Sequence, residues 1–275
     1  MLKPVTSFAN PTIKRLRSLH DKKGRRAEGL FLAEGLRVVA EAVAAGWAPR
    51  ALLLTADAAV HPLGRSAARM CLETGGEALE VPRELLAKVC AKDNPAGAAA
   101  AFAIPDTSLT RVDVRSSPVW IAAEKLKDPG NLGTMLRTAD ATGAGGLILV
   151  DQSCDPWSVE AVRASMGAVF TRAVAQAGWD EFRRWASGAQ LVGAVVGADT
   201  IDYQAVRYAA PTVLLMGNEQ SGLPGAYAAA CDERVTIPMA GKADSLNVAV
   251  AAAVLLYEVV NQRRRADPPD RHQPS

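Results

Sequence analysis

The second half of the chain repeats one pattern, in which short apolar runs alternate with helical segments. The strand candidates are Val119–Ala123, Gly146–Val150, Leu191–Val196, Thr212–Met216 and Arg234–Pro238. The helical segments are Leu132–Thr142, Val159–Met166, Trp179–Ser187, Gly225–Cys231 and Leu246–Arg263. Apolar strands separated by helices are typical of a parallel sheet that is covered on both faces. The sequence therefore predicts an α/β fold, with ligands beyond the carboxyl ends of the strands.

The first half carries a separate α/β pattern. Residues 12–28 are expected to be helical, Gly29–Glu34 to be a strand and Leu36–Ala45 to be a further helix. At the end of the first half, a polar stretch is bounded by Pro105 and Pro118, as is common in linkers. We expect a small α/β domain at 1–105, a linker at 106–117, a second domain at 118–263 and a disordered tail at 264–275.

Positive charge is concentrated near the N-terminus. The net charge of +2 divides into +6 over residues 1–28 and −4 over the remainder. The candidate RNA-binding cations are Lys14, Arg15, Arg17, Lys22, Lys23, Arg25 and Arg26. A solvated basic face would explain many such clusters, but clustering at one end favours contact with a polyanion such as nucleic acid.

Cysteine, histidine and hydropathy patterns exclude several classes of protein. The four cysteines show no CxxC spacing and there are only three histidines, so we expect no metal site and reduced thiols. The longest apolar runs fall short of the ~20 residues of a membrane span. No secretory pattern opens the chain, and we expect a cytoplasmic protein.

Three polar segments interrupt the apolar pattern, and each follows a predicted strand. The first runs from Asp128 through Pro129-Gly130 to Asn131, which can cap the helix that carries Arg137. Side chains lean toward the N-terminus of a helix, so Arg137 can reach back toward the same turn. Because this helix is otherwise made of small and apolar residues, we interpret Arg137 as a functional residue and not a surface cation.

The second and third segments are a glycine-rich turn and a helix start. Gly217 and Gly222 flank Glu219, and glycines permit the close approach of a backbone to a ligand. Ser245 and Asn247 stand where a long apolar helix begins, beside free backbone N–H groups. That helix is apolar on all sides, which implies burial all round and makes a second subunit plausible.

Taken in order, these residues resemble the three motifs of the SpoU/TrmH family. The motifs are Asn131-x-Gly133-x-x-x-Arg137, Gly217-x-Glu219-x-x-Gly222-Leu223 and Ile237-Pro238-Met239 followed by Ser245-Leu246-Asn247. The stretch from Arg163 to Gly167 is similar to the family's segment between the first two motifs. The resemblance covers residues from about 118 to 262. The first half is more weakly similar to the L30e-like substrate-binding domain of many members.

The resemblance implies an activity and a fold. Family members methylate ribose 2′-hydroxyls in RNA with S-adenosylmethionine, and need no metal for it. The second domain would be a SPOUT fold with a C-terminal trefoil knot, acting as a homodimer. The cofactor would be held largely by backbone groups, which here map to Gly217, Ile237 and Leu246. The catalytic positions would be Asn131, Arg137, Glu219, Ser245 and Asn247.

Two questions stay open at this stage. Arg137 is unsuited to be a general base because a guanidinium stays protonated in proteins, so we expect it to bind a substrate phosphate.

The target is expected to be structured RNA, and ribosomal RNA is favoured over transfer RNA. A non-catalytic RNA-binding protein is the main alternative. A Rossmann oxidoreductase does not fit, because the glycines at 143–146 precede a strand instead of following one.

Overall fold

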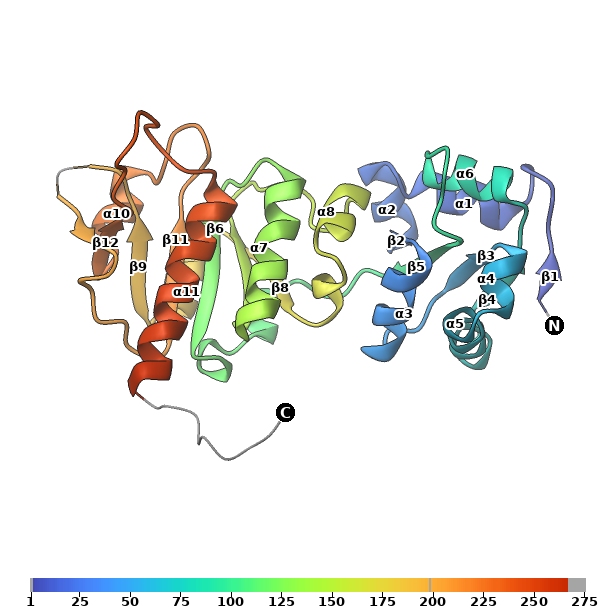
Figure 1. The fold of residues 1–275 in the computed structure, drawn as a ribbon, viewed down its shortest axis with the longest axis horizontal. Coiled ribbons are helices and arrows are strands. Elements are labelled where there is room, and N and C mark those ends of the chain that lie inside the picture. The colour runs from blue at the N-terminus through green and yellow to red at the C-terminus, as the bar shows by residue number, and fades with distance from the viewer. Residues whose placement is uncertain (1, 198, 267–275) are drawn as a thin grey trace. The chain divides into compact units, whose positions relative to one another are not determined.

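The computed structural model describes residues 2–197 and 199–266, and it divides into two α/β units. The first unit comprises the chain up to Asp106 together with Asp155–Thr171. The second comprises Thr107–Cys154 and the chain from Arg172 onward. Figure 1 labels the elements of both units, and each unit is described separately below.

The first unit is built on a mixed five-stranded sheet of order β1-β4-β3-β5-β2. Its strands are β1 (Lys3–Pro4), β2 (Leu30–Glu34), β3 (Ala51–Leu54), β4 (Glu77–Glu80) and β5 (Ala98–Ala103). Its helices are α1 (Pro11–Ser18), α2 (Lys22–Glu28), α3 (Leu36–Ala44), α4 (Ala56–Val60), α5 (Pro62–Glu73), α6 (Arg83–Cys90) and α8 (Val159–Ala164), with the 3₁₀ turn η3 (Ala168–Phe170). Helices α1, α2 and α6 lie on one side of the sheet, and α3 and α5 on the other (Figure 1).

The single helix expected at 12–28 is in fact two helices. The chain turns between α1 and α2, which buries Leu19 completely. Arg25 then folds back, and its Nη1 donates to the carbonyl oxygens of Leu19 and His20, both at 2.8 Å. Helix α2 ends at Gly29, whose φ of 63° explains why the following strand starts one residue later than expected.

The segment Asp155–Thr171 belongs to the first unit, although the sequence pattern placed it in the domain at 118–263. Its Trp157 and Phe170 rings lie 4.8 and 5.9 Å from the ring of Phe31. The indole N–H of Trp47 also donates to the Phe170 carbonyl at 2.9 Å. Burial of these aromatic rings together explains why the segment packs in the first unit and not with the residues that flank it in sequence.

The second unit contains a seven-stranded sheet in which every pairing is parallel, in the order β10-β12-β9-β11-β6-β7-β8. Its strands are β6 (Val119–Glu124), β7 (Gly146–Val150), β8 (Ala173–Ala177), β9 (Gln190–Ala194), β10 (Ile201–Asp202), β11 (Thr212–Met216) and β12 (Glu233–Thr236). The parallel α/β class is therefore confirmed, and β8 and β10 are additions to the five expected strands.

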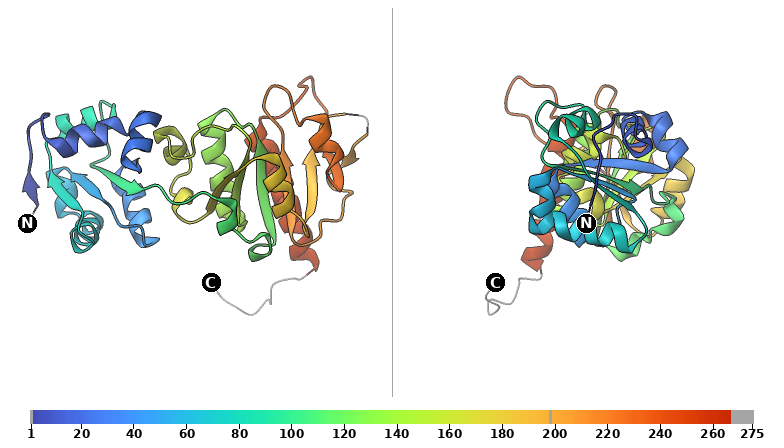
Figure 2. Two further views of the ribbon diagram at one scale, coloured as in Figure 1. Left: turned by 180° about the vertical axis from the view of Figure 1, so that it is seen from behind. Right: turned by 90° about the vertical axis from the view of Figure 1, so that its right-hand side faces the viewer.

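Helices cover both faces of this sheet. They are α7 (Pro129–Thr142), α9 (Trp179–Trp185), α10 (Gly225–Ala229) and α11 (Val248–Ala266), with the 3₁₀ turns η1 (Leu109–Arg111) and η2 (Val114–Ser116). Helices α7 and α11 pack side by side on one face (Figure 1). Helices α9 and α10 cover the opposite face, seen from behind in Figure 2.

The C-terminal helix is longer than expected. Arg264 and Arg265 form part of α11, so the disordered tail expected at 264–275 is wrong for these two residues, and residues 267–275 lie outside the described part of the chain. None of the described helices is long and apolar enough to cross a membrane. None of the four cysteines, all of which lie in the described ranges, is paired in a disulfide, and burial raises the pKa of Cys71 to about 11 and that of Cys90 to about 12.

Candidate active site

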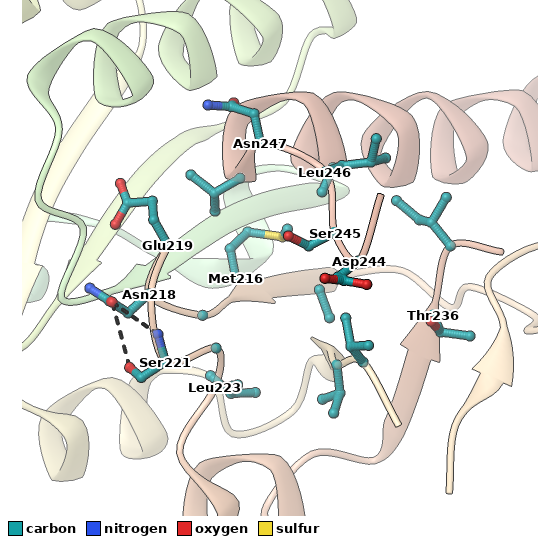
Figure 3. A pocket seen from close by; sticks show the side chains of 18 of the residues that line it. Met216, Asn218, Glu219, Ser221, Leu223, Thr236, Asp244, Ser245, Leu246 and Asn247 are labelled. Carbon is teal, nitrogen blue, oxygen red and sulfur yellow. Dashed lines mark hydrogen bonds between the residues drawn. The ribbon is translucent and has the colours of Figure 1, made fainter. Parts of the chain in front are cut away.

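A pocket of about 560 Å³ lies at the carboxyl ends of β9, β11 and β12. The pocket is lined by residues 194–196, 216–223, 235–237, 239 and 244–248, and by Ala251 and Leu255 of α11. Figure 3 shows the loop after β11 facing the segment that leads into α11. The second and third polar motifs therefore meet in one cavity, at the edge of the sheet where the sequence predicted a ligand.

Gly217 shapes the loop after β11. A Cβ atom at this position would lie 2.2 Å from the backbone nitrogen of Leu223, a distance that real side chains do not reach. The approach is this close because Asn218 and Gly222 exchange two backbone hydrogen bonds, of 3.1 and 2.9 Å. The loop is thus a tight turn that requires glycine at 217.

Asn218, which no sequence motif identifies, fixes this turn to the rest of the sheet. Its Oδ1 accepts from the Gln220 backbone N–H at 2.9 Å, and its Nδ2 donates to the Lys125 carbonyl at 2.8 Å. Lys125 follows β6 with a φ of 44°, which turns its carbonyl out of the regular strand geometry. The position of Glu219 is therefore set by a contact with the end of the neighbouring strand β6.

Asn131 joins all three motifs through one carboxamide. Its Nδ2 donates to Oε1 of Glu219 at 3.2 Å, and its Oδ1 accepts from Nδ2 of Asn247 at 2.9 Å. The prediction that Asn131 caps α7 is wrong, because Asp128 is the capping residue. Oδ1 of Asp128 accepts from the Asn131 backbone N–H at 2.7 Å. Helix α7 consequently begins at Pro129, and the Asn131 side chain is left to connect the motifs.

Asn247 caps the last helix and contacts the first motif at the same time. Its Oδ1 accepts from the backbone N–H groups of Ala249 and Val250, at 2.9 and 3.3 Å. Helix α11 therefore starts at Val248 and not at Leu246. Ser245 lies in the preceding loop, where it lines the pocket.

The three positions expected to hold a cofactor by their backbones all line this pocket: Gly217, Ile237 and Leu246. The apolar side chains around them include Val195, Met216 and Leu255. Such a cavity suits an amphipathic ligand of small-molecule size, because most binding pockets are largely apolar with a few polar groups. In the described part of the chain, no group of three or more His, Cys, Asp or Glu residues could hold a metal ion.

Arg137 is the one predicted catalytic residue that neither lines the pocket nor contacts a residue that does. It is exposed on α7, and it forms no hydrogen bond or ion pair with any described residue. Six residues separate it from Asn131, which amounts to about 9 Å along a helix and a different face. The expectation that it reaches back to the first turn is therefore wrong for a single chain.

Tyr227 supports the helix that follows the Glu219 loop. Its ring stacks on Trp179 with a centroid distance of 3.6 Å and an interplanar angle of 4°. Its hydroxyl donates to Oδ2 of Asp151 at 2.7 Å. Burial, followed by this hydrogen bond, raises the pKa of Tyr227 to about 12, so the phenol stays neutral and structural.

The basic residues near the N-terminus divide into two groups. Lys14, Arg17, Lys22, Lys23 and Arg26 are exposed, and Arg15 is half-buried. The prediction that Arg25 binds RNA is wrong, because Arg25 is only 4% exposed and its guanidinium donates to Oδ2 of Asp155 at 2.7 and 3.0 Å. A cation that is paired and buried in this way is not available to RNA.

Comparison with protein families assigns both halves of the chain. Residues 118–257 match the model of the SpoU rRNA Methylase family. Residues 10–100 match the MRM3-like substrate binding domain.

Individual relatives cover nearly the whole chain. A 23S rRNA (uridine(2479)-2′-O)-methyltransferase of Streptomyces viridochromogenes is 34% identical, over 89% of this chain and 87% of its own. The Bacillus subtilis 23S rRNA (guanosine(2553)-2′-O)-methyltransferase RlmP is 29% identical, over 94% and 99%. A crystal structure of an AdoMet-bound rRNA methyltransferase from Sinorhizobium meliloti is 39% identical, with a TM-score of 0.87 over 97% and 98% of the two chains.

Proposed function

The chain belongs to the SpoU rRNA methylase family, and from that premise we propose that it methylates a ribose 2′-hydroxyl of ribosomal RNA with S-adenosylmethionine. The observation that carries the proposal is the pair of hydrogen bonds from Asn131 to Glu219 and Asn247. They join residues of all three motifs at the rim of one pocket, although 116 residues separate Asn131 from Asn247.

The pocket fits the cofactor. Its volume of about 560 Å³ lies within the range of ~300–1,000 Å³ for small-molecule sites. Backbone groups at Gly217, Ile237 and Leu246 are available to an adenine ring, with apolar side chains beside them. When bound, S-adenosylmethionine supplies a methyl group on a positively charged sulfur. The trefoil knot that accompanies the SPOUT fold remains an implication of the family.

The protein's own task is to align the ribose hydroxyl and to accept its proton. No histidine occurs between residues 118 and 263, so the proton acceptor has to be another group. Glu219 is suitably placed, since its carboxylate is held by Nδ2 of Asn131 and, at 3.5 Å, by the backbone N–H of Lys127. Ser245 and Asn247 hold the nucleotide and the loop beside it.

Arg137 completes the site from a second copy of the chain. It does not line the pocket of its own chain, yet it is exposed and its guanidinium matches the geometry of a phosphate. Helix α11 also leaves Val250 and Tyr257 exposed, at 49% and 47%, which suits a homodimer through the α7–α11 face.

Mixing two inactive variants tests this arrangement. Dimers formed from Arg137→Ala and Glu219→Ala chains should recover activity if the arginine acts across the interface, because one of their two sites is then intact. Mixtures as inactive as either variant alone would place Arg137 in the site of its own chain. A monomer by light scattering would exclude the dimer.

The division of labour follows the two family matches. We assign RNA binding to residues 1–105, with the linker at 106–117 and catalysis to the part of 118–263 that lies outside Asp155–Thr171, the segment that packs in the first unit. Ribosomal RNA is favoured over transfer RNA because both named relatives act on 23S rRNA. Those relatives modify a uridine and a guanosine, so the base of the target nucleotide is not fixed by the family. The proposed action on ribosomal RNA favours a cytoplasmic location.

Two measurements test the function. Calorimetry should detect binding of S-adenosylmethionine and none of NAD. Mapping of 2′-O-methyl groups in total RNA, with and without this protein, should reveal a ribosomal position that is methylated only when the protein is present. Binding without any such position would favour a non-catalytic RNA-binding protein, and a position in transfer RNA would redirect the substrate.

A further inference from the structure

The ionisable side chains that line the pocket are all acidic. Among the described residues that line it, Glu219 and Asp244 are the only ionisable ones, and no lysine, arginine or histidine joins them. Lys242 is the one cation of the segment 237–247, and it is not part of the lining. A bound ligand therefore meets two carboxylates and no compensating positive side chain from the same chain.

The two carboxylates are not equivalent. Glu219 is engaged by Asn131 and turns toward the rim of the pocket (Figure 3). Asp244 is exposed, lines the pocket next to Ser245 (Figure 3), and forms no hydrogen bond or ion pair with any residue in the described ranges. Asp244 thus presents an unpaired negative charge to whatever the pocket holds.

The methyl donor and its product differ in charge at a single atom. Transfer breaks the bond between the methyl carbon and sulfur and forms a bond between that carbon and the ribose oxygen. The sulfonium becomes a neutral thioether and the hydroxyl loses one proton, so the charge and the atoms balance. The adenine, the ribose, the amino group and the carboxylate are common to both molecules.

We propose that Asp244 is a specificity-determining residue, which favours the positively charged methyl donor over the neutral product. The inference rests on the proposed function, because it assumes that the pocket binds S-adenosylmethionine. A carboxylate near a cation attracts it, and the attraction at the sulfur disappears once the methyl group has moved. The same residue would therefore help to load the donor and to release the spent cofactor.

Calorimetry with three ligands tests the proposal. S-adenosylmethionine and its amine analogue sinefungin carry a positive charge at or near the position of the sulfur, whereas S-adenosylhomocysteine does not. Asp244→Asn should weaken binding of the first two about three- to tenfold, as expected for a partly exposed charge pair, and that of the third less than about twofold. In the unchanged protein, added salt should reduce the preference for the donor.

Asp199→Asn is the matched control, since it removes the same charge from an exposed residue outside the pocket lining. It should leave all three affinities unchanged, and equal melting temperatures should verify that both variants fold. If Asp244→Asn weakens all three ligands equally, the carboxylate contacts a shared part such as the ribose and the proposal is wrong. No change in any affinity would also overturn it. Failure of the unchanged protein to bind any of the three would instead contradict the proposed function.

Discussion

A single carboxamide, that of Asn131, determines how the three motifs are held together. It donates to Glu219 and accepts from Asn247, while Asp128 satisfies the backbone at the start of α7. Asn131 itself does not line the pocket. Catalysis and cofactor binding should therefore respond differently to changes at this residue.

Replacement of Asn131 by Asp should separate the two. The new oxygen would face the Glu219 carboxylate where an N–H donor stood, and the resulting repulsion would displace the proton acceptor. We expect kcat to fall about 100-fold, as misplacement of a catalytic group commonly causes, with the affinity for S-adenosylmethionine changed less than about twofold. Thr134→Ala, at an exposed position of the same helix, is the control. Equal losses of kcat and cofactor affinity would contradict the bridging role.

Arg137→Lys tests the role of the planar guanidinium. Lysine keeps the charge but cannot make two parallel hydrogen bonds to a phosphate. We expect a fall in kcat/KM for RNA of at least about tenfold, because a bidentate contact is worth more than a point charge. Cofactor affinity should not change, since Arg137 lies outside the pocket lining. Near-normal turnover with the lysine variant would contradict the claim that a planar guanidinium is needed.

At the scale of single elements, the turn after β11 is the most constrained. Gly217→Ala would place a methyl group 2.2 Å from the Leu223 nitrogen, so the turn would have to open. We expect cofactor binding to fall below detection by calorimetry and the protein to lose about 1–3 kcal/mol of stability, as for other overpacked sites. Gly241→Ala, in the loop before α11 and with open space around its Cβ, should change neither. Normal cofactor binding by Gly217→Ala would show that the turn is less important than its geometry suggests.

The elements differ in how far the sequence could predict them. Strand β11 was predicted with its observed bounds, Thr212–Met216, because a fully buried strand in a parallel sheet leaves an unbroken apolar run. Strand β8, Ala173–Ala177, was missed because its alanines and glutamine carry no such signal. The break between α1 and α2 was missed as well, since it depends on the fold-back of Arg25, a tertiary contact.

The sequence could predict which residues form the site, but not the hydrogen bonds that connect them. Motif spacing identified Glu219, Ser245 and Asn247, which all line the pocket. The hydrogen bonds of Asn131 and the contact from Asn218 to Lys125 span 88 to 116 residues, and no local pattern encodes them. The unpaired carboxylate of Asp244 likewise becomes meaningful only when the pocket lining is known.

At the scale of the whole molecule, the first unit cannot simply be removed to test RNA binding. Deletion of residues 1–105 would also remove Phe31 and Trp47, against which Trp157 and Phe170 are buried. The exposed rings would favour aggregation, so a loss of function would have two explanations. Substitutions on the surface give a cleaner test.

A charge-reversal pair on α2 provides that test. Lys22 and Arg26 are exposed and one helical turn apart, and changing both to Glu should weaken RNA binding at least about tenfold and reduce the salt dependence of binding. Arg65 and Arg69, exposed at the same spacing on α5, form a matched pair with the same change of charge. Filter binding at several salt concentrations would measure both pairs. Equal effects would indicate a general charge effect and not an RNA-binding face on α2.

The most direct test of the account is methyl transfer in vitro. Ribosomal RNA from cells that lack this protein would be incubated with it and with S-adenosylmethionine labelled in the methyl group, then digested to nucleosides and analysed by mass spectrometry. We predict that the label appears in a single nucleoside as a 2′-O-methyl ribose, and that the Asn131→Asp variant loses this product while it still binds the cofactor. Label on a base, or no transfer by a protein that binds both S-adenosylmethionine and the RNA, would contradict it.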